Sequence, residues 1–184
     1  EILKYLDFVD PQIQEIGSVN VIKIRNEKGR PSLYGYNSDI KGISDSIIPV
    51  IDSGIKNVLI LGSGGSSNAV RYAMRKLGLS VTVVSRTKTE GTITYDQVSH
   101  DLMFKTDIII NTTPLGMYPD VTGLPPLNYH FLKSNHILFD LVYNPEITAF
   151  LRKGEEKGCR IITGLKMLYS QAERSWDIWN DENL

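Results

Sequence analysis

The sequence lacks disulfide-forming cysteine pairs, an excess of either charge and long apolar runs. Cys159 is the single cysteine in 184 residues, so the chain cannot form an internal disulfide. The formal net charge of −1 gives no reason to expect nucleic acid or an anionic membrane as a partner. No apolar run reaches the length of a membrane span. We therefore expect neither nucleic acid nor a membrane as a partner, and a reducing cytoplasm fits these absences.

Metal-ligand spacing is also missing. His100, His130 and His136 lie in unrelated polar contexts, so we expect three surface residues and no metal site. Cys159 follows Gly158 and precedes an apolar run, which favours a buried strand thiol over a nucleophile.

The first forty residues do not show a regular alternation of strands and helices. The sequence opens without methionine inside a helical pattern, residues 1–6, so we expect a fragment or the ordered part of a longer protein. Asp10 as N-cap and Pro11 at the first helical position predict a short helix that ends at Gly17. A hairpin should follow, with strands over 19–25 and 32–36, and then an amphipathic helix over 40–51 interrupted by Pro49.

One stretch organises the rest of the chain. Residues 58–61 are a short branched apolar run, typical of a buried parallel strand, and Gly62-Ser63-Gly64-Gly65 follows at once. Residues 66–77 then read as a helix. Glycines let a backbone approach a pyrophosphate closely, while the free N–H groups of a helix start favour its charge. Ser67 stands where the usual fingerprint has a third glycine, so a plain strand-to-helix turn stays an alternative.

Strands and helices alternate steadily after this turn. We expect further strands over 81–84, 108–110, 137–141 and 160–163, and helices over 148–157 and 165–179. The pattern predicts a doubly wound α/β fold with a parallel sheet, to which residues 1 to about 40 do not belong.

The end of the second strand of this fold indicates the cofactor. In nicotinamide folds an acid at this place binds the ribose 2′-hydroxyl, whereas a basic residue accommodates a 2′-phosphate. Here the strand ends in Ser85-Arg86-Thr87-Lys88, without an acid. A guanidinium can pair with a phosphate through two hydrogen bonds. The sequence therefore predicts NADP rather than NAD, the alternative being that Arg86 and Lys88 only form a solvated strand end.

Several polar side chains could carry chemistry. Asp39 is a candidate acid or base; it could also be the N-cap of the helix from Ile40, and both roles can hold at once. Tyr143 follows the fourth strand and could serve packing or function. Gln171 on the last helix would ordinarily be solvated.

In their order along the chain, these segments resemble the shikimate dehydrogenase family closely. The resemblance covers essentially the whole chain. The matching segments are Gly17-Ser-Val-Asn20, Gly35-Tyr-Asn-Ser-Asp39 with Gly42, Gly62-Ser-Gly-Gly-Ser66 with Ala69, Ser85-Arg-Thr87, Asn111-Thr-Thr-Pro-Leu-Gly-Met117, Asp140-Leu-Val-Tyr-Asn-Pro145 and Gly164-Leu-Lys-Met-Leu-Tyr-Ser-Gln-Ala172.

The resemblance implies reversible hydride transfer between NADPH and 3-dehydroshikimate, which gives shikimate in aromatic amino-acid biosynthesis. It makes Asp39 the catalytic carboxylate, paired in the family with a lysine that would lie just upstream of Glu1, outside this sequence. The implied substrate-binding residues are Asn20, Asp39, Tyr143 and Gln171. The implied cofactor-binding residues are Gly62, Ser63, Gly64, Gly65, Ser66, Ser85, Arg86, Thr87, Asn111, Thr112, Thr113, Leu141, Gly164 and Met167.

The resemblance also implies a division of the chain. Residues 1–40 would be the C-terminal part of a substrate-binding domain, 41–165 an NADP-binding Rossmann domain, and 166–184 a helix returning to the substrate domain. Ser38 and Ser85 stand where the family has threonine and asparagine. Two alternatives remain: an NADP-binding module without activity, and an NAD-using quinate/shikimate relative. We expect a monomer or homodimer.

Overall fold

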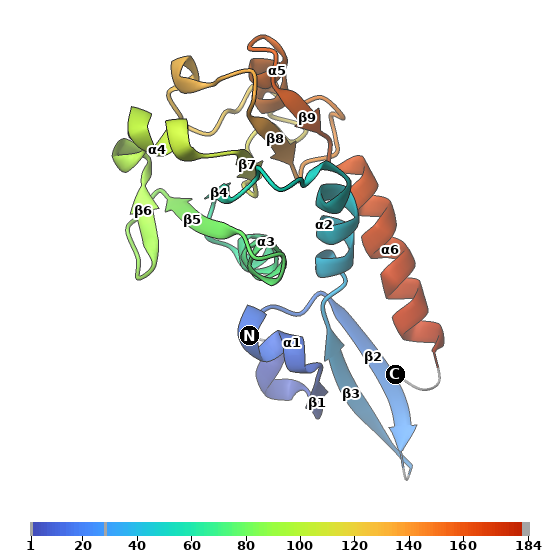
Figure 1. The fold of residues 1–184 in the computed structure, drawn as a ribbon. Helices are drawn as coiled ribbons and strands as arrows, with labels where there is room; N and C mark the ends of the chain where they lie inside the picture. Colours follow the sequence, from blue (N-terminus) through green and yellow to red (C-terminus); the bar gives the residue numbers. More distant parts are fainter. Residues whose placement is uncertain (1, 28, 182–184) are drawn as a thin grey trace.

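The computed structural model describes residues 2–27 and 29–181 and contains two sheets (Figure 1). The larger sheet is all parallel, with the strand order β6-β5-β4-β7-β8-β9. Its first strand in the sequence lies in the middle, which is the doubly wound order, so the predicted fold is confirmed. The strands are β4 (Asn57–Leu61), β5 (Ser80–Ser85), β6 (Thr92–Thr94), β7 (Ile108–Asn111), β8 (Ile137–Asp140) and β9 (Arg160–Ile162).

Both faces of this sheet are covered by helices. One face packs against α2 (Asp39–Ile47), α3 (Gly65–Lys76) and the start of α6 (Leu165–Asn180). The other face packs against α4 (His100–Lys105) and α5 (Ala149–Glu155). Because both faces are buried, the central strands are apolar throughout, and the four residues of β7 and of β8 are all buried.

The smaller sheet has the order β1-β3-β2, with β1 (Phe8–Val9) parallel to β3 (Arg30–Tyr36) and β2 (Val21–Glu27) antiparallel to it. The hairpin is therefore confirmed, although Lys28 in its turn lies outside the described residues. Helix α1 (Pro11–Ile16) begins and ends as predicted. The Asp10 carboxylate accepts a hydrogen bond from the Gln12 N–H, and Gly17 closes the helix with φ 68°.

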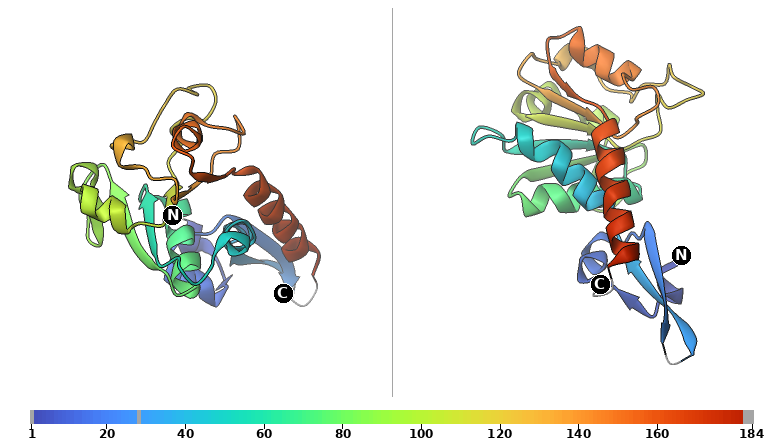
Figure 2. Two further views of the ribbon diagram at one scale, coloured as in Figure 1. Left: turned by 45° about the horizontal axis from the view of Figure 1, so that its top comes forward. Right: turned by 90° about the vertical axis from the view of Figure 1, so that its right-hand side faces the viewer.

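Helix α6 joins the two sheets (Figure 2, right). It begins beside the parallel sheet, and its last turns lie against the hairpin. There Ile178 is buried with Val21 and Tyr36, and the Trp179 indole N–H donates to the Ile22 carbonyl at 3.2 Å. Lys23 is buried there, and its ammonium donates to the Asp181 carbonyl. No described helix is long and apolar enough to span a bilayer.

The structure also departs from the predicted elements. Strand β6 was not predicted, and residues 2–5 form a short 3₁₀ helix (Ile2–Tyr5), with Glu1 outside the described residues. Pro49 ends α2 early, because the helix gives way to a 3₁₀ turn, Ile48–Val50. Two more 3₁₀ turns are Tyr95–Gln97 and Tyr129–Phe131.

The prediction that all three histidines lie on the surface is wrong for His136, which is fully buried. Its Nδ1 accepts the Lys133 N–H at 3.1 Å, and its Nε2 lies 3.1 Å from the Met103 carbonyl. These two bonds satisfy both ring nitrogens of a neutral imidazole, and burial lowers the pKa of His136. Cys159 is buried as predicted, directly before β9.

Candidate functional site

The turn from β4 to α3 brings the backbone close to the residues that follow β7, the neighbouring strand in the sheet. Gly62 has φ 110°, and a Cβ atom at this position would lie 2.6 Å from the Thr112 hydroxyl. The Gly62 N–H donates to the Val84 carbonyl at 2.8 Å, and the Thr112 hydroxyl donates to the Leu61 carbonyl at 2.7 Å. Glycine is therefore required here both for the positive φ and for the close approach.

The start of α3 can receive an anion. Its N-cap is Gly64, and no side chain among the described residues caps the helix. Residues 63–66 are exposed. Uncapped N–H groups and the helix dipole together favour a phosphate at this place.

A cleft of about 500 Å³ opens beside this turn. Eight of the predicted cofactor residues line it: Gly62, Ser63, Gly64, Ser85, Arg86, Thr87, Thr112 and Thr113. Five further residues that we did not predict also line it: Thr89, Tyr95, Pro114, Leu115 and Pro126. Thr89 and Tyr95 flank the missed strand β6. The short alternation Thr92-Ile-Thr94 was the only signal for that strand, and it carries no cofactor pattern.

The rim of the cleft is basic at the end of β5. Arg86 is exposed there. Burial raises the pKa of the nearby Tyr95 hydroxyl, and the charge of Arg86 opposes part of that rise. Below it, the hydroxyl oxygens of Ser63 and Ser85 lie 3.0 Å apart, joining the glycine turn to the strand end. An exposed guanidinium beside an uncapped helix start fits a dinucleotide with a 2′-phosphate.

The other predicted cofactor residues do not line this cleft. Gly65 and Ser66 begin α3, and Asn111 is fully buried at the end of β7. Leu141 follows β8 and lies against Gly164, where a Cβ atom would be 2.5 Å from the Leu141 carbonyl oxygen. Met167 is buried on α6 against α2.

A second polar cluster lies where the hairpin, α2 and α6 meet. The Ser38 N–H donates to the Asn20 side-chain oxygen at 2.8 Å, and the Ser38 hydroxyl donates to the Gln171 side-chain oxygen at 3.3 Å. The Ser175 hydroxyl lies 3.0 Å from that of Ser38. Ser38 is fully buried, and its hydroxyl also accepts the Asn20 amide N–H₂ at 3.2 Å, so it links α6 to the segment before the hairpin.

Asp39 adjoins this cluster. Burial raises the pKa of the Asp39 carboxyl, and a hydrogen bond with the Asn20 side chain opposes part of that rise. The interpretation of Asp39 as N-cap is wrong, because α2 begins at Asp39 itself and Ser38 precedes it. Gln171 is half-buried and bonded, against the expectation from its helix alone that it is solvated. Tyr143, on the turn after β8, is 48% exposed.

These features define a class of protein: a dinucleotide-binding α/β fold with a polar cluster between its cofactor sheet and a second, smaller sheet. The shikimate dehydrogenase of Methanococcus aeolicus, named NADP(+)-dependent, is 40% identical over 97% of this chain and 68% of its own length. The chain belongs to the shikimate dehydrogenase family. No protein-family model matches it.

Solved structures agree with this assignment. Shikimate dehydrogenase from Aquifex aeolicus superposes with a TM-score of 0.82 at 33% identity, over 97% of this chain and 67% of that one. The enzyme from Thermus thermophilus, solved in complex with NADP(H) and shikimate, gives 0.81 at 30% identity, over 97% and 68%.

Proposed function

We propose that this protein catalyses the reversible NADP-dependent reduction of 3-dehydroshikimate to shikimate, a step of aromatic amino-acid biosynthesis. Membership of the shikimate dehydrogenase family supports the reaction. The observation that carries the proposal in this chain is the pairing of two sites: a glycine turn with Arg86 at its rim, and the cluster around Asp39.

The cofactor site would hold the pyrophosphate and the 2′-phosphate of NADP at two separate places. The α3 start would bind the pyrophosphate, and Arg86 with Thr87 would bind the 2′-phosphate. NADPH, when bound, supplies the hydride. Thr112, Thr113 and the Leu141 loop would then face the nicotinamide half, because the ends of β7 and β8 lie at the same sheet edge as the glycine turn.

The substrate site would be the cluster of Asn20, Asp39 and Gln171, with Tyr143 at its edge. Ser38 fixes the two amides relative to each other, because the Asn20 N–H₂ also donates to the Ser38 hydroxyl at 3.2 Å. The Gln171 N–H₂ would remain for a substrate hydroxyl. A carbonyl that accepts hydride gains negative charge and needs a proton. A carboxyl with a raised pKa, such as that of Asp39, is suited to hold or relay that proton at the reacting oxygen.

The test is shikimate-dependent reduction of NADP by the full-length protein, followed by the absorbance of NADPH. Turnover with shikimate supports the proposal. No turnover, or turnover only with another polyol acid, contradicts it.

A second candidate is an NADP-binding module without activity. The observation behind it is that, among the described residues, no hydrogen bond or ion pair joins a lysine to Asp39. Calorimetry distinguishes the two candidates. Binding of NADPH without shikimate favours the module, binding of both favours the enzyme, and binding of neither rejects both.

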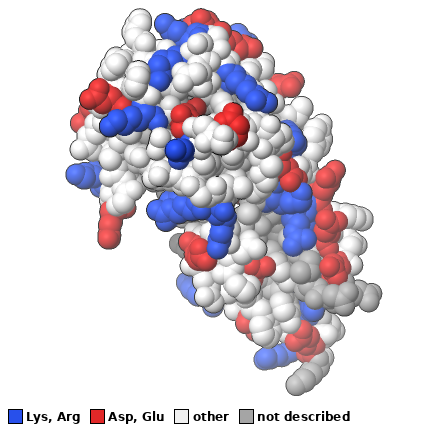
Figure 3. All heavy atoms as spheres, in the orientation of Figure 1, with Lys and Arg blue, Asp and Glu red and all other residues white. Residues whose placement is uncertain are grey.

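The remaining predictions concern partners. On the face drawn in Figure 3, basic and acidic side chains are interspersed, which gives no support there for a nucleic-acid surface. A monomeric or homodimeric state and a cytoplasmic location stay predictions.

A further inference from the structure

Asp140 is a buried carboxylate that takes no part in the proposed reaction. It ends β8 and is fully buried. Its Oδ1 accepts hydrogen bonds from the Asn111 side-chain amide and from the Val142 N–H, both at 3.0 Å. Its Oδ2 accepts the Thr148 hydroxyl at 2.6 Å. Two oxygens thus receive three donors from three different segments, an arrangement that an ionised carboxylate satisfies best.

The first of these bonds fixes the loop after β7. The Asn111 amide N–H₂ faces Asp140, so its oxygen must point the other way. That oxygen accepts the Thr113 N–H at 3.0 Å and the Thr113 hydroxyl at 2.7 Å. Thr113 lines the cofactor cleft. The orientation of Thr113 therefore depends on the Asp140 carboxylate, through the side-chain amide of Asn111.

The second bond fixes the loop after β8 and, through it, the start of α6. The Val142 N–H is held directly by Asp140. Gly164 lies so close to this loop that a Cβ atom would be 2.5 Å from the Leu141 oxygen and 2.7 Å from the Val142 oxygen. Because α6 begins at Leu165, the helix that carries Met167 and Gln171 starts on a loop anchored by Asp140.

The third bond is of a different kind. The Thr148 hydroxyl also accepts the Leu151 N–H at 3.3 Å as the N-cap of α5. Helix α5 packs on the opposite face of the sheet from α2 and α6. This bond therefore anchors the carboxylate to the core without touching the cleft.

We propose that Asp140 is a positioning residue that holds the loops after β7 and β8, through Asn111 and Val142, in the arrangement required by the nicotinamide half of the cofactor. The inference rests on the proposed function, since it presumes that NADP occupies the cleft. It predicts that loss of the carboxylate weakens only the nicotinamide half of the binding. The adenosine half would bind at the end of β5, where Ser85, Arg86 and Thr87 line the cleft.

The test compares Asp140→Asn with wild type by calorimetry, using two probes. One is NADP, and the other is adenosine 2′,5′-bisphosphate, which has the 2′-phosphate end but no nicotinamide. Asparagine keeps the shape of aspartate but replaces one acceptor oxygen with a donor. We expect the NADP affinity to fall by about 10-fold or more, and the affinity for the bisphosphate to stay at the wild-type value.

Asp107→Asn is the matched control. The Asp107 carboxylate also accepts two bonds, from the Lys56 and Asn57 N–H groups at 2.8 and 2.9 Å, at the opposite edge of the same sheet. Its loss should leave both affinities unchanged. If Asp140→Asn weakens both probes equally, or neither, the proposal is overturned. Failure of the wild type to bind NADP would instead overturn the proposed function.

A second variant keeps the proposal testable if Asp140→Asn does not fold. Asn111→Ala removes the link from Asp140 to Thr113 while the bonds to Val142 and Thr148 remain. We expect the same selective loss of NADP over the bisphosphate. An unchanged ratio of the two affinities in Asn111→Ala would overturn the proposal.

Discussion

Asp39 is the residue on which the proposed chemistry depends. Burial raises the pKa of its carboxyl, and a hydrogen bond with the Asn20 side chain still stabilises the charged form. Such a group can exchange a proton nearer to neutral pH than an exposed aspartate can.

Asp39→Asn should lower kcat for shikimate oxidation by roughly 10²- to 10⁴-fold, because the amide cannot take up or release the proton. The affinity for NADP should stay close to wild type, since Asp39 does not line the cofactor cleft. Steady-state kinetics and calorimetry measure the two effects. A large loss of cofactor binding would argue that Asp39 is structural.

Arg86 decides which cofactor fits. Arg86→Ala should weaken NADPH by roughly 10- to 100-fold and NADH far less, because a charge-assisted pair with the 2′-phosphate is lost. Lys88→Ala is the control, since Lys88 is also basic but does not line the cleft. Calorimetry with both cofactors measures the effect. Equal losses for NADPH and NADH in Arg86→Ala would indicate that this guanidinium does not read the 2′-phosphate.

Asp140 makes stability depend on pH. Burial raises the pKa of its carboxyl to about 6, opposed by the bonds from Thr148, Val142 and Asn111. An unfolded aspartate titrates near 3.9, so between about pH 4 and pH 6 the folded protein binds more protons than the unfolded chain. Its ionisation therefore lowers the free energy of unfolding as the pH rises through this window.

Asp140→Asn cannot ionise and removes this contribution. The free energy of unfolding of wild type minus that of the variant should fall by about 2 kcal/mol between pH 4 and pH 7. Asp39 is present in both proteins, so its own titration cancels. Urea unfolding at several pH values measures the difference, and parallel stability curves would contradict the assigned cause.

At the scale of elements, the turn from β4 to α3 depends on one glycine. Gly62→Ala adds a Cβ atom 2.6 Å from the Thr112 hydroxyl at a positive φ, so the turn and the β7 exit must separate. We expect a loss of stability of about 1–3 kcal/mol and a loss of NADP affinity of roughly 10-fold or more.

Gly78→Ala separates the two causes. Gly78 also has a positive φ, 78°, but nothing lies within 4 Å of its added Cβ atom. This control should lose about 1 kcal/mol through backbone strain and keep its NADP affinity. Thermal unfolding and calorimetry measure both variants. Equal NADP affinities in the two would show that the close approach of Gly62 to Thr112 is irrelevant to binding.

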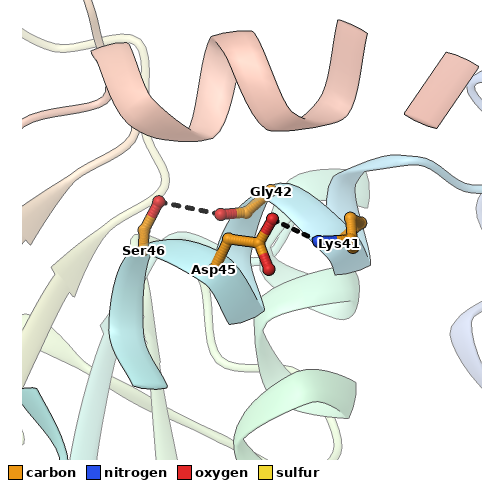
Figure 4. A network of polar contacts seen from close by, with 4 residues as sticks. All are labelled: Lys41, Gly42, Asp45 and Ser46. Atoms are coloured by element: carbon orange, nitrogen blue, oxygen red, sulfur yellow. Dashed lines mark hydrogen bonds and ion pairs between the residues drawn. The ribbon is translucent and has the colours of Figure 1, made fainter. Parts of the chain in front are cut away.

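At the scale of the whole molecule, the contact of α2 with α6 connects the two sheets. Gly42 lies on the side of α2 that faces α6 (Figure 4). A Cβ atom there would lie 2.6 Å from the Met167 carbonyl oxygen and 3.2 Å from the Gln171 Cβ atom. The two helices therefore pack at a distance that only glycine permits, and Gln171 reaches Ser38 from this position.

Gly42→Ala should lower stability by about 1–3 kcal/mol and raise the KM for shikimate, because α6 must move away from the Ser38 cluster. Ser44→Ala on the same helix is the control. It removes one oxygen atom and adds no atom to the contact with α6, so it should change neither the stability nor the KM. Unfolding and steady-state assays measure both variants. An unchanged KM in a destabilised Gly42→Ala protein would show that this packing does not set the substrate site.

We propose the same division of the chain as the sequence predicts. Residues 1–40 and 166–184 form the substrate unit, and residues 41–165 form the cofactor unit. The separate small sheet and the last turns of α6 against Val21 and Tyr36 support this division.

The strand alternation was predictable because each central strand is a continuous apolar run, and the glycine turn and Arg86 were predictable because local spacing defines them. Strand β6 escaped prediction because three half-buried residues carry too little periodicity.

The sequence by itself determined the doubly wound fold, the place of the cofactor turn and the family, since these depend on patterns contiguous along the chain. Only the tertiary structure decided which polar groups are buried together. His136 looks like a surface residue in its polar neighbourhood, and Asp140 like an ordinary strand end. The fold surrounds one with Met103 and Lys133, and the other with Asn111 and Thr148. Burial and hydrogen-bond partners arise from segments distant in the sequence, which no local pattern encodes.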